Sequence, residues 1–250
     1  MVKFEYFAEM HVSAATPPRG PLAGHTSVMV SGANFMRTAD LSCGFGSVFT
    51  SATMLSQNLI SCEAPERDIA AVVLLSVSVN GQEGGPARVT YVYDELPTVL
   101  YVSPANGPRL GGTSVVVTGE GFVEGETLAC RIGNVVIRAA YVSAGVLTCW
   151  TERNEVGIAP LEVTNNGVDF STDGKSFLFQ NLLTITSVVP NSIAANSAIR
   201  LRVTGLNLMP GGTCMLADNV ADYQTWLNSN EMICEFGPVR EVGVHVVAVT

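Results

Sequence analysis

The sequence is short of basic residues, of aromatic residues and of long hydrophobic runs. Lysine occurs only as Lys3 and Lys175, and 13 Lys+Arg stand against 22 Asp+Glu, so the formal net charge is −9. Such a chain is poorly suited to neutralising a phosphate backbone, which excludes nucleic acid as the expected partner. No apolar run approaches the roughly 20 residues that span a bilayer, so we expect no transmembrane segment in these residues.

The residues that are abundant predict a folded all-β chain. Apolar residues make up 47% of the 250 residues and charged residues only 14%, which excludes intrinsic disorder. Aromatic residues make up 7%, whereas Val, Thr, Ser and Gly are frequent, and this favours β structure. The length suits one large domain or about two to three small ones.

A repeat governs the whole chain. The six cysteines form three pairs whose members are almost equally far apart in sequence: Cys43 and Cys62, Cys130 and Cys149, Cys214 and Cys234. Each pair also follows the one before it at nearly the same offset. Other landmarks keep this offset, namely Pro17, Pro104 and Pro190, then Gly32, Gly119 and Gly205, then Phe35, Phe122 and Leu208. The chain is therefore a tandem array of three repeats. The repeat length is given by the spacing from Cys43 to Cys130, and the spacing from Cys130 to Cys214 is slightly shorter.

Within each repeat the pattern predicts short β-strands. Residues Ile199–Thr204 alternate apolar and polar side chains, and their counterparts in the other repeats are Val28–Val30 and Val115–Val117. We expect inward side chains at Val28, Val30, Val115, Val117, Leu201 and Val203, and outward ones at Met29, Val116 and Arg202. Asn80-Gly81 and Asn166-Gly167 predict tight hairpins in which both turn residues have positive φ. Each repeat thus reads as a β-sandwich without a helix longer than one turn.

The second repeat opens with a motif that resembles the start of IPT/TIG domains: Val102-Ser103-Pro104, Gly107-Pro108, Gly111-Gly112-Thr113, Val117-Thr118-Gly119 and Phe122. Cys43-Gly44-Phe45-Gly46 and Ser61-Cys62-Glu63-Ala64-Pro65 resemble the extracellular version of the motif. The third repeat departs from it at Ser192, Ala194 and Ala195. The resemblance covers almost the whole chain. It implies tandem immunoglobulin-like β-sandwiches of the early set, shared by plexins, scatter-factor receptors, fibrocystin-like proteins and some transcription factors.

The two ends of the chain predict an incomplete array. Tyr6 precedes Pro17 by the same distance in sequence as Tyr93 precedes Pro104 and Phe179 precedes Pro190. The segment Val2, Lys3, Phe4, Glu5, Tyr6 therefore reads as the last strand of a preceding domain. The spacing from Cys149 to Leu161 equals that from Cys234 to Val246, so the third closing hairpin would fall beyond Thr250. The expected domains are residues 7–94, 95–180 and 181–250, after a remnant at 1–6.

Two interpretations of these ends stay open. The plainer one is a fragment of a longer extracellular array. The other is that Val2–Tyr6 of one chain completes the third domain of the next by β-strand addition, which would build head-to-tail filaments. The observation behind the second is that one end carries the strand that the other end lacks.

The cysteines are the most informative candidate residues. Six cysteines allow 15 pairings, and the repeat selects Cys43–Cys62, Cys130–Cys149 and Cys214–Cys234. Reduced, buried pairs are the alternative, but the resembling ectodomains share such a disulfide, and disulfides belong to oxidising compartments. The resemblance therefore implies an extracellular or cell-surface location. No Asn-x-Ser/Thr sequon is present to support secretion independently.

Catalytic and metal-binding motifs are missing from the sequence. The three histidines, His11, His25 and His245, stand at unrelated repeat positions, and we interpret them as surface or loop residues. Two cysteines per repeat without a histidine companion do not supply the four ligands of a zinc site. Asp94 and Glu95 at the first domain junction are a minor candidate for calcium, since Gln180-Asn181 at the second junction has no carboxylate. We expect no enzyme and no cofactor.

Three functions are compared. The favoured one is a non-enzymatic spacer and protein-interaction surface of a cell-surface, adhesion, matrix or filament protein, with protein partners or self-association through sheet edges. The alternative is an accessory carbohydrate-binding module of a secreted enzyme. It is disfavoured because exposed aromatic residues do not recur at repeated positions, and we expect Trp150, beside Cys149, to pack on the disulfide or the sheet. DNA binding is the least favoured, because the arginines are scattered among acids.

Overall fold

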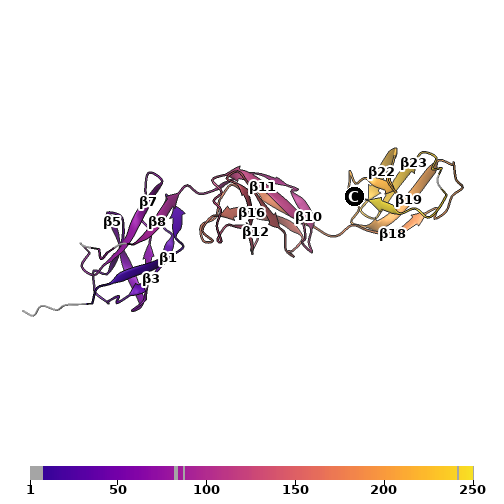
Figure 1. The fold of residues 1–250 in the computed structure, drawn as a ribbon. Coiled ribbons are helices and arrows are strands. Elements are labelled where there is room, and N and C mark those ends of the chain that lie inside the picture. The colour runs from indigo at the N-terminus through magenta and orange to yellow at the C-terminus, as the bar shows by residue number, and fades with distance from the viewer. Residues whose placement is uncertain (1–7, 82–83, 87, 241, 250) are drawn as a thin grey trace, which may run out of the picture. The chain divides into compact units, whose positions relative to one another are not determined.

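The computed structural model describes residues 8–81, 84–86, 88–240 and 242–249. Every regular element in these residues is a β-strand, as the sequence predicted (Figure 1). The chain divides into two compact units, Met1–Phe179 and Gln180–Thr250. The first unit holds two domains, built from strands β1–β8 and β9–β17, and the second unit holds one, built from β18–β24. In the part of the chain described here, no helix has the length and apolarity needed to cross a membrane.

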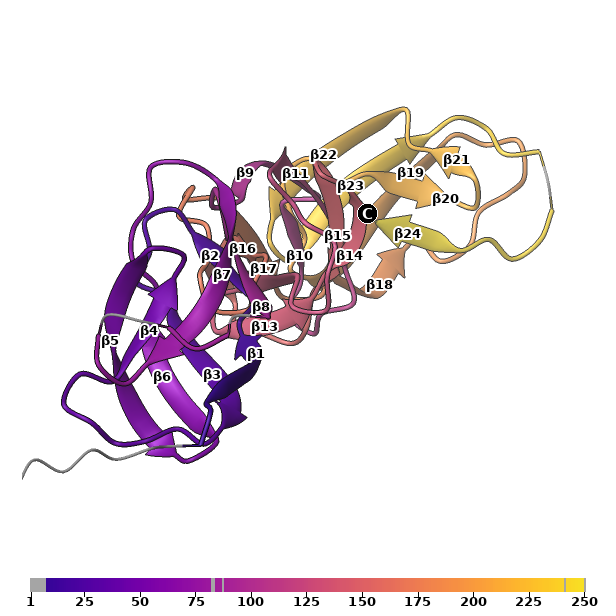
Figure 2. The ribbon, with the colours of Figure 1, turned by 60° about the vertical axis from the view of Figure 1, so that its left-hand side comes forward.

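The first domain is an eight-stranded sheet folded on itself into two layers. The strand order is β1-β3-β6-β5-β4-β7-β8-β2, and the long strand β5 joins the layers because it pairs with β6 on one side and with β4 on the other (Figure 2). The strands are β1 His11–Thr16, β2 Arg19–Pro21, β3 Ser27–Ala33, β4 Ser42–Phe45, β5 Val48–Ser56, β6 Leu59–Glu63, β7 Ala71–Ser78 and β8 Val89–Asp94.

The second domain has the same plan with its layers separated. One sheet has the order β14-β15-β11-β9 and the other β10-β17-β16-β12-β13, so that β13 and β14 together take the place of β5. The strands are β9 Thr98–Ser103, β10 Asn106–Pro108, β11 Ser114–Glu120, β12 Ala129–Ile132, β13 Val135–Arg138, β14 Ala140–Ser143, β15 Val146–Trp150, β16 Gly157–Thr164 and β17 Ser176–Gln180.

The third domain repeats the plan with fewer strands. Its sheets have the orders β18-β19-β23-β22 and β21-β20-β24. The strands are β18 Thr184–Val189, β19 Ile199–Leu206, β20 Cys214–Leu216, β21 Asn219–Val220, β22 Tyr223–Asn228, β23 Glu231–Phe236 and β24 Val247–Val249.

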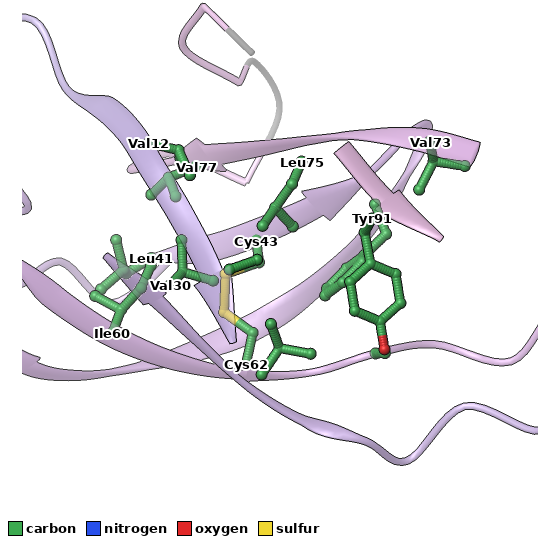
Figure 3. Packing of buried hydrophobic residues seen from close by; sticks show 14 of the residues in the cluster. Val12, Val30, Leu41, Cys43, Ile60, Cys62, Val73, Leu75, Val77 and Tyr91 are labelled. Carbon is green, nitrogen blue, oxygen red and sulfur yellow. A yellow bond between two sulfur atoms is a disulfide. The ribbon is translucent and has the colours of Figure 1, made fainter. Parts of the chain in front are cut away.

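The predicted alternation of inward and outward side chains is confirmed. All six residues expected to face inward are buried, namely Val28, Val30, Val115, Val117, Leu201 and Val203. On the opposite faces Met29 is half-buried, whereas Val116 and Arg202 are exposed. The alternation follows from the pleat of a strand whose one face packs on the core. Figure 3 shows the core of the first domain, with Val30, Ile60 and Leu75 around the Cys43–Cys62 bond.

The tight Asn-Gly hairpins are a prediction that the structure contradicts. Gly81 and Gly167 have φ of +70° and +80°, but neither Asn80 nor Asn166 has a positive φ. The strands separate well before these residues, since Pro160 is the last partner of β17, opposite Ser176. Asn166 Oδ1 instead accepts hydrogen bonds from the backbone of residues 168 and 169, at 3.0 and 2.8 Å. The asparagine thus shapes a wide loop through its side chain, a local alternative to the two-residue turn.

The predicted register of the last strand is also wrong by one residue. Leu161 pairs with Ile132, two residues after Cys130, whereas Val247 pairs with Leu216, two residues after Cys214. Val247, not Val246, is therefore the counterpart of Leu161. Val246 is 73% exposed. The connection after Cys234 is one residue longer than the one after Cys149, and a shift of one residue moves a side chain to the other face of the strand.

Candidate functional site

The three cysteine pairs form disulfides that join the two layers of each domain. Each bond connects the strand β4, β12 or β20 of one layer to β6, β15 or β23 of the other: Cys43–Cys62, Cys130–Cys149 and Cys214–Cys234. Their Cα–Cα distances are 6.2, 6.4 and 6.1 Å, and five of the six residues are fully buried at 0% exposure, with Cys62 at 2%. Their surroundings are apolar, which suits a covalent support of the core rather than a reactive thiol site.

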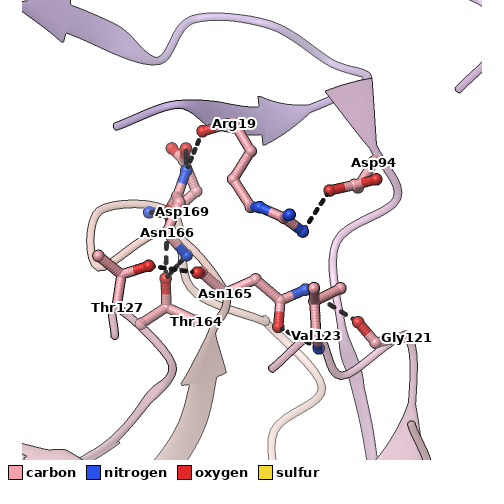
Figure 4. A network of polar contacts seen from close by, with 9 residues as sticks. All are labelled: Arg19, Asp94, Gly121, Val123, Thr127, Thr164, Asn165, Asn166 and Asp169. Carbon is pink, nitrogen blue, oxygen red and sulfur yellow. Dashed lines mark hydrogen bonds and ion pairs between the residues drawn. The ribbon is translucent and has the colours of Figure 1, made fainter. Parts of the chain in front are cut away.

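Polar side chains hold the first two domains together at their junction. Thr26 of the first domain donates through its hydroxyl to Asp169 Oδ2 of the second at 2.7 Å. Asn166 of the second domain donates through its side-chain amide to the backbone oxygen of Arg19 in the first at 3.1 Å (Figure 4). Thr26 is fully buried and Asn166 is 5% exposed, so both donor side chains are buried, and the two contacts themselves are part-buried. The same Asn166 amide also donates to Asp169 Oδ2 at 2.6 Å, which ties the two interdomain contacts to one carboxylate.

The loop that carries these groups is fixed by its own hydrogen bonds. Thr164 Oγ1 accepts from the backbone N–H of Gly167 at 2.9 Å. Asn165 Oδ1 accepts from the backbone of Val123 at 3.1 Å, and its amide donates to the carbonyl of Gly121 at 2.8 Å. Thr164, Asn165 and Asn166 are all buried. The wide loop that replaces the predicted tight hairpin is therefore a preformed platform for the first domain.

An ion pair completes the first domain's side of the junction. Arg19 Nη1 lies 2.9 Å from Asp94 Oδ2, and both side chains are only partly exposed. A cavity of about 20 Å³ separates them from Asn165, Asn166 and Asp169, and it has room for about one water molecule. The guanidinium next to Asp94 works against calcium there, since a second cation would lie close to a positive charge. Among the described residues, no group of three or more His, Cys, Asp or Glu side chains converges to hold a metal.

Two tyrosines of β8 lie under this junction. Tyr91 and Tyr93 are both fully buried, their rings meet edge to face at a centroid distance of 5.0 Å, and Phe45 packs on both. Burial raises the pKa of Tyr91 to about 12, and it also raises the pKa of Tyr93. Gly20 is required here because a Cβ at this position would collide with the Tyr91 hydroxyl and with Thr26. The closing strand thus connects the core of the first domain to the surface that meets the second.

The other candidate residues are separate from one another. The predicted strand-exchange segment Val2–Tyr6 lies outside the described residues. His25 is in a loop and lies 2.6 Å from Glu63 Oε1, His11 is exposed on β1, and His245 precedes β24.

Three exposed apolar side chains, Tyr101, Val116 and Trp150, lie on one face of the sheet β14-β15-β11-β9 of the second domain, among serines and threonines. Trp150 was expected to pack on the disulfide or the sheet; it is 58% exposed and points away from the disulfide, because Cys149 takes the inward position of the alternating strand. Val116 and Tyr101 share its face, as the register of β9, β11 and β15 shows. In the first domain, Glu63 stands at the position of Trp150, and the half-buried Met29 stands at the position of Val116. In the third domain, Arg202 and Glu231 form an ion pair on this face. Among these outward positions, an exposed apolar side chain is therefore found in the second domain and not in the other two.

Sequence reasoning missed the junction, although it left a trace. Thr26 and Asp169 were not singled out, because each is one polar residue in a loop. The trace is that two of the junction residues depart from the repeat: Arg19 stands where the second domain has Asn106, and Asp94 stands where it has Gln180. Residues that differ between otherwise matching repeats are candidates for contacts that one repeat alone makes.

Comparisons with known proteins agree with this architecture. The sequence model of one family, described as IPT/TIG domain, matches residues 10–93, 97–179 and 183–250. "Fibrocystin-L" of Mus musculus is 26% identical over 231 residues, which cover 91% of this chain and 5% of that protein. "Plexin-A3" of Mus musculus is 27% identical over 156 residues, which cover 59% of this chain and 8% of that protein. The chain thus spans less than a tenth of the length of these relatives.

A solved structure shows the same fold. The extracellular region of Plexin A4, domains 1 to 10, superposes with a TM-score of 0.51 at 19% identity. The match covers 94% of this chain and 21% of that one.

Proposed function

The chain belongs to the IPT/TIG domain family, and we propose that it is a non-enzymatic spacer and protein-interaction surface of a larger protein at the cell surface or in the matrix. Its disulfide-bonded IPT domains form an extracellular array, because disulfides persist in oxidising compartments. We take residues 7–94, 95–180 and 181–250 as its three domains and residues 1–6 as the end of a preceding one.

The observation that carries the spacer role is the polar junction of the first two domains. Neighbouring domains joined by a short linker move relative to each other unless their interface holds them. Here a buried threonine and a buried asparagine bind across the interface, at 2.7 Å from Thr26 to Asp169 and 3.1 Å from Asn166 to Arg19. A preformed platform loses little conformational entropy when the domains dock. The first and second domains therefore behave as one rigid unit, which keeps the parts of the protein attached at its two ends a fixed distance apart.

The interaction surface that we propose is the face of the second domain that carries Tyr101, Val116 and Trp150. Tyr101 is 73% exposed, Trp150 58% and Val116 41%, on adjacent strands of one sheet. Exposed aromatic residues on a rigid sheet are typical of sites that bury against a protein partner. Glycan binding is the second candidate for the same face, since Trp150 and Tyr101 also offer flat apolar surfaces.

The test is a binding screen with the full chain and matched variants. Immobilised protein is offered to a panel of extracellular protein domains and to a panel of polysaccharides. Trp150→Ser is expected to abolish capture of a protein ligand, whereas Ile158→Ser leaves it unchanged. Ile158 is the control because it is 76% exposed on β16, in the other sheet of the same domain. Capture of polysaccharides alone would favour the glycan role, and equal loss in both variants would refute a site on this face.

A further inference from the structure

Asn166 and Gly167, in the loop that meets the first domain, combine a structural role with an intrinsic chemical reactivity. When glycine follows asparagine, the backbone nitrogen of the glycine attacks the side-chain amide carbon of the asparagine readily, because glycine has no Cβ that shields it. The new bond between this nitrogen and Cγ expels the side-chain nitrogen, which leaves as ammonia with the backbone proton, and a succinimide ring remains. Water then opens the ring to aspartate, or to isoaspartate, in which the main chain runs through the former side-chain carbon.

The folded loop holds the reacting atoms in hydrogen bonds. The backbone N–H of Gly167 donates to Thr164 Oγ1 at 2.9 Å. The Asn166 amide nitrogen donates to the backbone oxygen of Arg19 and to Asp169 Oδ2, at 3.1 and 2.6 Å (Figure 4). Cyclisation requires Cγ to turn toward the Gly167 nitrogen and the amide nitrogen to leave, so these bonds have to break first. Because Gly167 is exposed, water reaches the loop when it opens. The reaction rate therefore follows the population of the open loop.

The first domain helps to keep this loop closed. The carbonyl that accepts from the Asn166 amide belongs to Arg19 of the first domain. Thr26 of the same domain donates to Asp169 Oδ2, the oxygen that also accepts from the Asn166 amide. A partner that binds only the closed loop stabilises it, and loss of that partner raises the open population. The docked first domain thus preserves the asparagine on which the docking depends.

The product of the reaction does not fit the closed junction. Conversion of Asn166 to an aspartate replaces the amide donor by a carboxylate oxygen, which then faces the Arg19 carbonyl and the Asp169 carboxylate at the distances now spanned by hydrogen bonds. Two carboxylates this close repel each other. Among the described residues that line the junction cavity, Arg19 is the only cation, and its guanidinium already pairs with Asp94. Isoaspartate also redirects the main chain, so the backbone hydrogen bonds of residues 168 and 169 to Asn166 Oδ1 are lost.

We propose that Asn166-Gly167 is a deamidation site that acts as a one-way switch of the junction between the first two domains. In the docked arrangement the amide donates across the junction and reacts slowly. Undocking frees the loop to open, and the aspartate or isoaspartate that forms prevents return to the docked arrangement. This inference rests on the rigid junction of the proposed spacer role and adds the covalent change that ends it.

The first test follows deamidation of the full chain by peptide mapping with mass spectrometry at mildly alkaline pH. Asn80-Gly81, in the equivalent loop of the first domain, is the reference site. In urea-unfolded protein both sites are expected to react at similar rates, since glycine follows in both. In folded protein, Thr26→Val is expected to speed the loss of Asn166 roughly thirtyfold, as the undocked population rises, and to leave Asn80 unchanged. Equal acceleration at both sites, no acceleration at Asn166, or an Asn166 that stays intact in urea would overturn the proposal.

A second measurement tests the product. Energy transfer between one dye in each of the first two domains reports their docking. Asn166→Asp is expected to raise the ratio of undocked to docked domains at least about thirtyfold, because repulsion replaces the hydrogen bond across the junction. Asn80→Asp is the matched control and is expected to keep the narrow distribution of the wild type. Deamidated wild type, separated by ion exchange after ageing, is expected to behave like Asn166→Asp.

The outcomes of this measurement separate the switch from the junction on which it rests. A narrow distribution in the wild type, in Asn166→Asp and in the deamidated fraction would overturn the switch alone. A distribution that is already broad in the fresh wild type would overturn both the rigid junction and the switch.

Discussion

The hydroxyl of Thr26 offers the sharpest test of the domain junction. Thr26→Val keeps the shape of the side chain and removes one atom that reaches the second domain, the donor to Asp169 at 2.7 Å. The loop of residues 164–170 is unchanged by this substitution, because its internal hydrogen bonds come from its own backbone and side chains. The variant therefore probes the interface without altering the platform on which it rests.

The expected effect follows from the type of bond. A hydrogen bond to a charged group contributes about 1.5 to 3 kcal/mol, and the one from Thr26 to Asp169 is part-buried. Taking about 2 kcal/mol, the ratio of undocked to docked domains rises roughly thirtyfold. The second contact, from Asn166 to the carbonyl of Arg19, remains, so the domains still dock but exchange more often with separated arrangements. The stability of the first domain itself changes less, since the backbone hydrogen bond from Ala64 to Thr26 is kept.

The assay is single-molecule energy transfer between dyes placed by unnatural amino acids at Leu55 and Val136. These residues are 53% and 54% exposed and lie in the first and second domains. Thr26→Val is expected to broaden the transfer distribution. Thr113→Val is the matched control, because Thr113 is the repeat counterpart of Thr26 within the second domain. An unchanged distribution in Thr26→Val would show that this hydroxyl does not hold the junction, and equal broadening in both variants would contradict a specific contact.

Three further predictions concern the cores. Replacing Cys130 and Cys149 together by Ala is expected to destabilise the second domain by about 3 kcal/mol through loss of a closed loop. Urea unfolding followed by Trp150 fluorescence, in a background in which Trp226 is changed to Phe, measures this loss of stability. An unchanged unfolding midpoint would contradict the stabilising role of the disulfide. Gly20→Ala is expected to destabilise the first domain, since its Cβ collides with the Tyr91 hydroxyl; a melting temperature equal to the wild type would refute the collision. Burial raises the pKa of Tyr91 from 10.0 to about 12, so the folded state holds the phenolic proton more tightly than the unfolded state does. The contribution of Tyr91 to stability is therefore intact below pH 10 and falls as the pH rises to 12. Tyrosinate absorbance during alkaline unfolding checks this, and ionisation of Tyr91 near pH 10 in folded protein would exclude it.

Most of the fold was predictable because it depends on local pattern and on repetition. Alternation of apolar and polar residues fixes which face of a strand is buried, and this held for Val28, Val115 and Leu201. The regular spacing of cysteines and prolines revealed three copies of one unit, and the motif around Pro104 identified the family. These signals survive in a single sequence because each copy confirms the others.

The errors arose where side chains compete with backbone preferences. Asn-Gly predicts a tight turn from backbone conformation alone, but the Asn166 side chain accepts two backbone hydrogen bonds and opens the loop instead. Trp150 was expected to pack on the disulfide or the sheet because it follows Cys149, although alternation turns its side chain outward once Cys149 is buried. The one-residue error at Val246 has a different origin, since connection lengths vary between copies.

The sequence by itself determined the period, the all-β sandwich and the pattern of buried side chains, because these depend on residues close together in the chain or equivalent between repeats. Only the tertiary structure decided that Thr26 meets Asp169, far along the chain in another domain, and that Arg19 meets Asn166 beside it. Such contacts depend on which loops the folded sheets bring to the same end of a domain. No short-range pattern encodes that meeting, because the hydrogen bonds form between groups that become neighbours only after both sandwiches have closed.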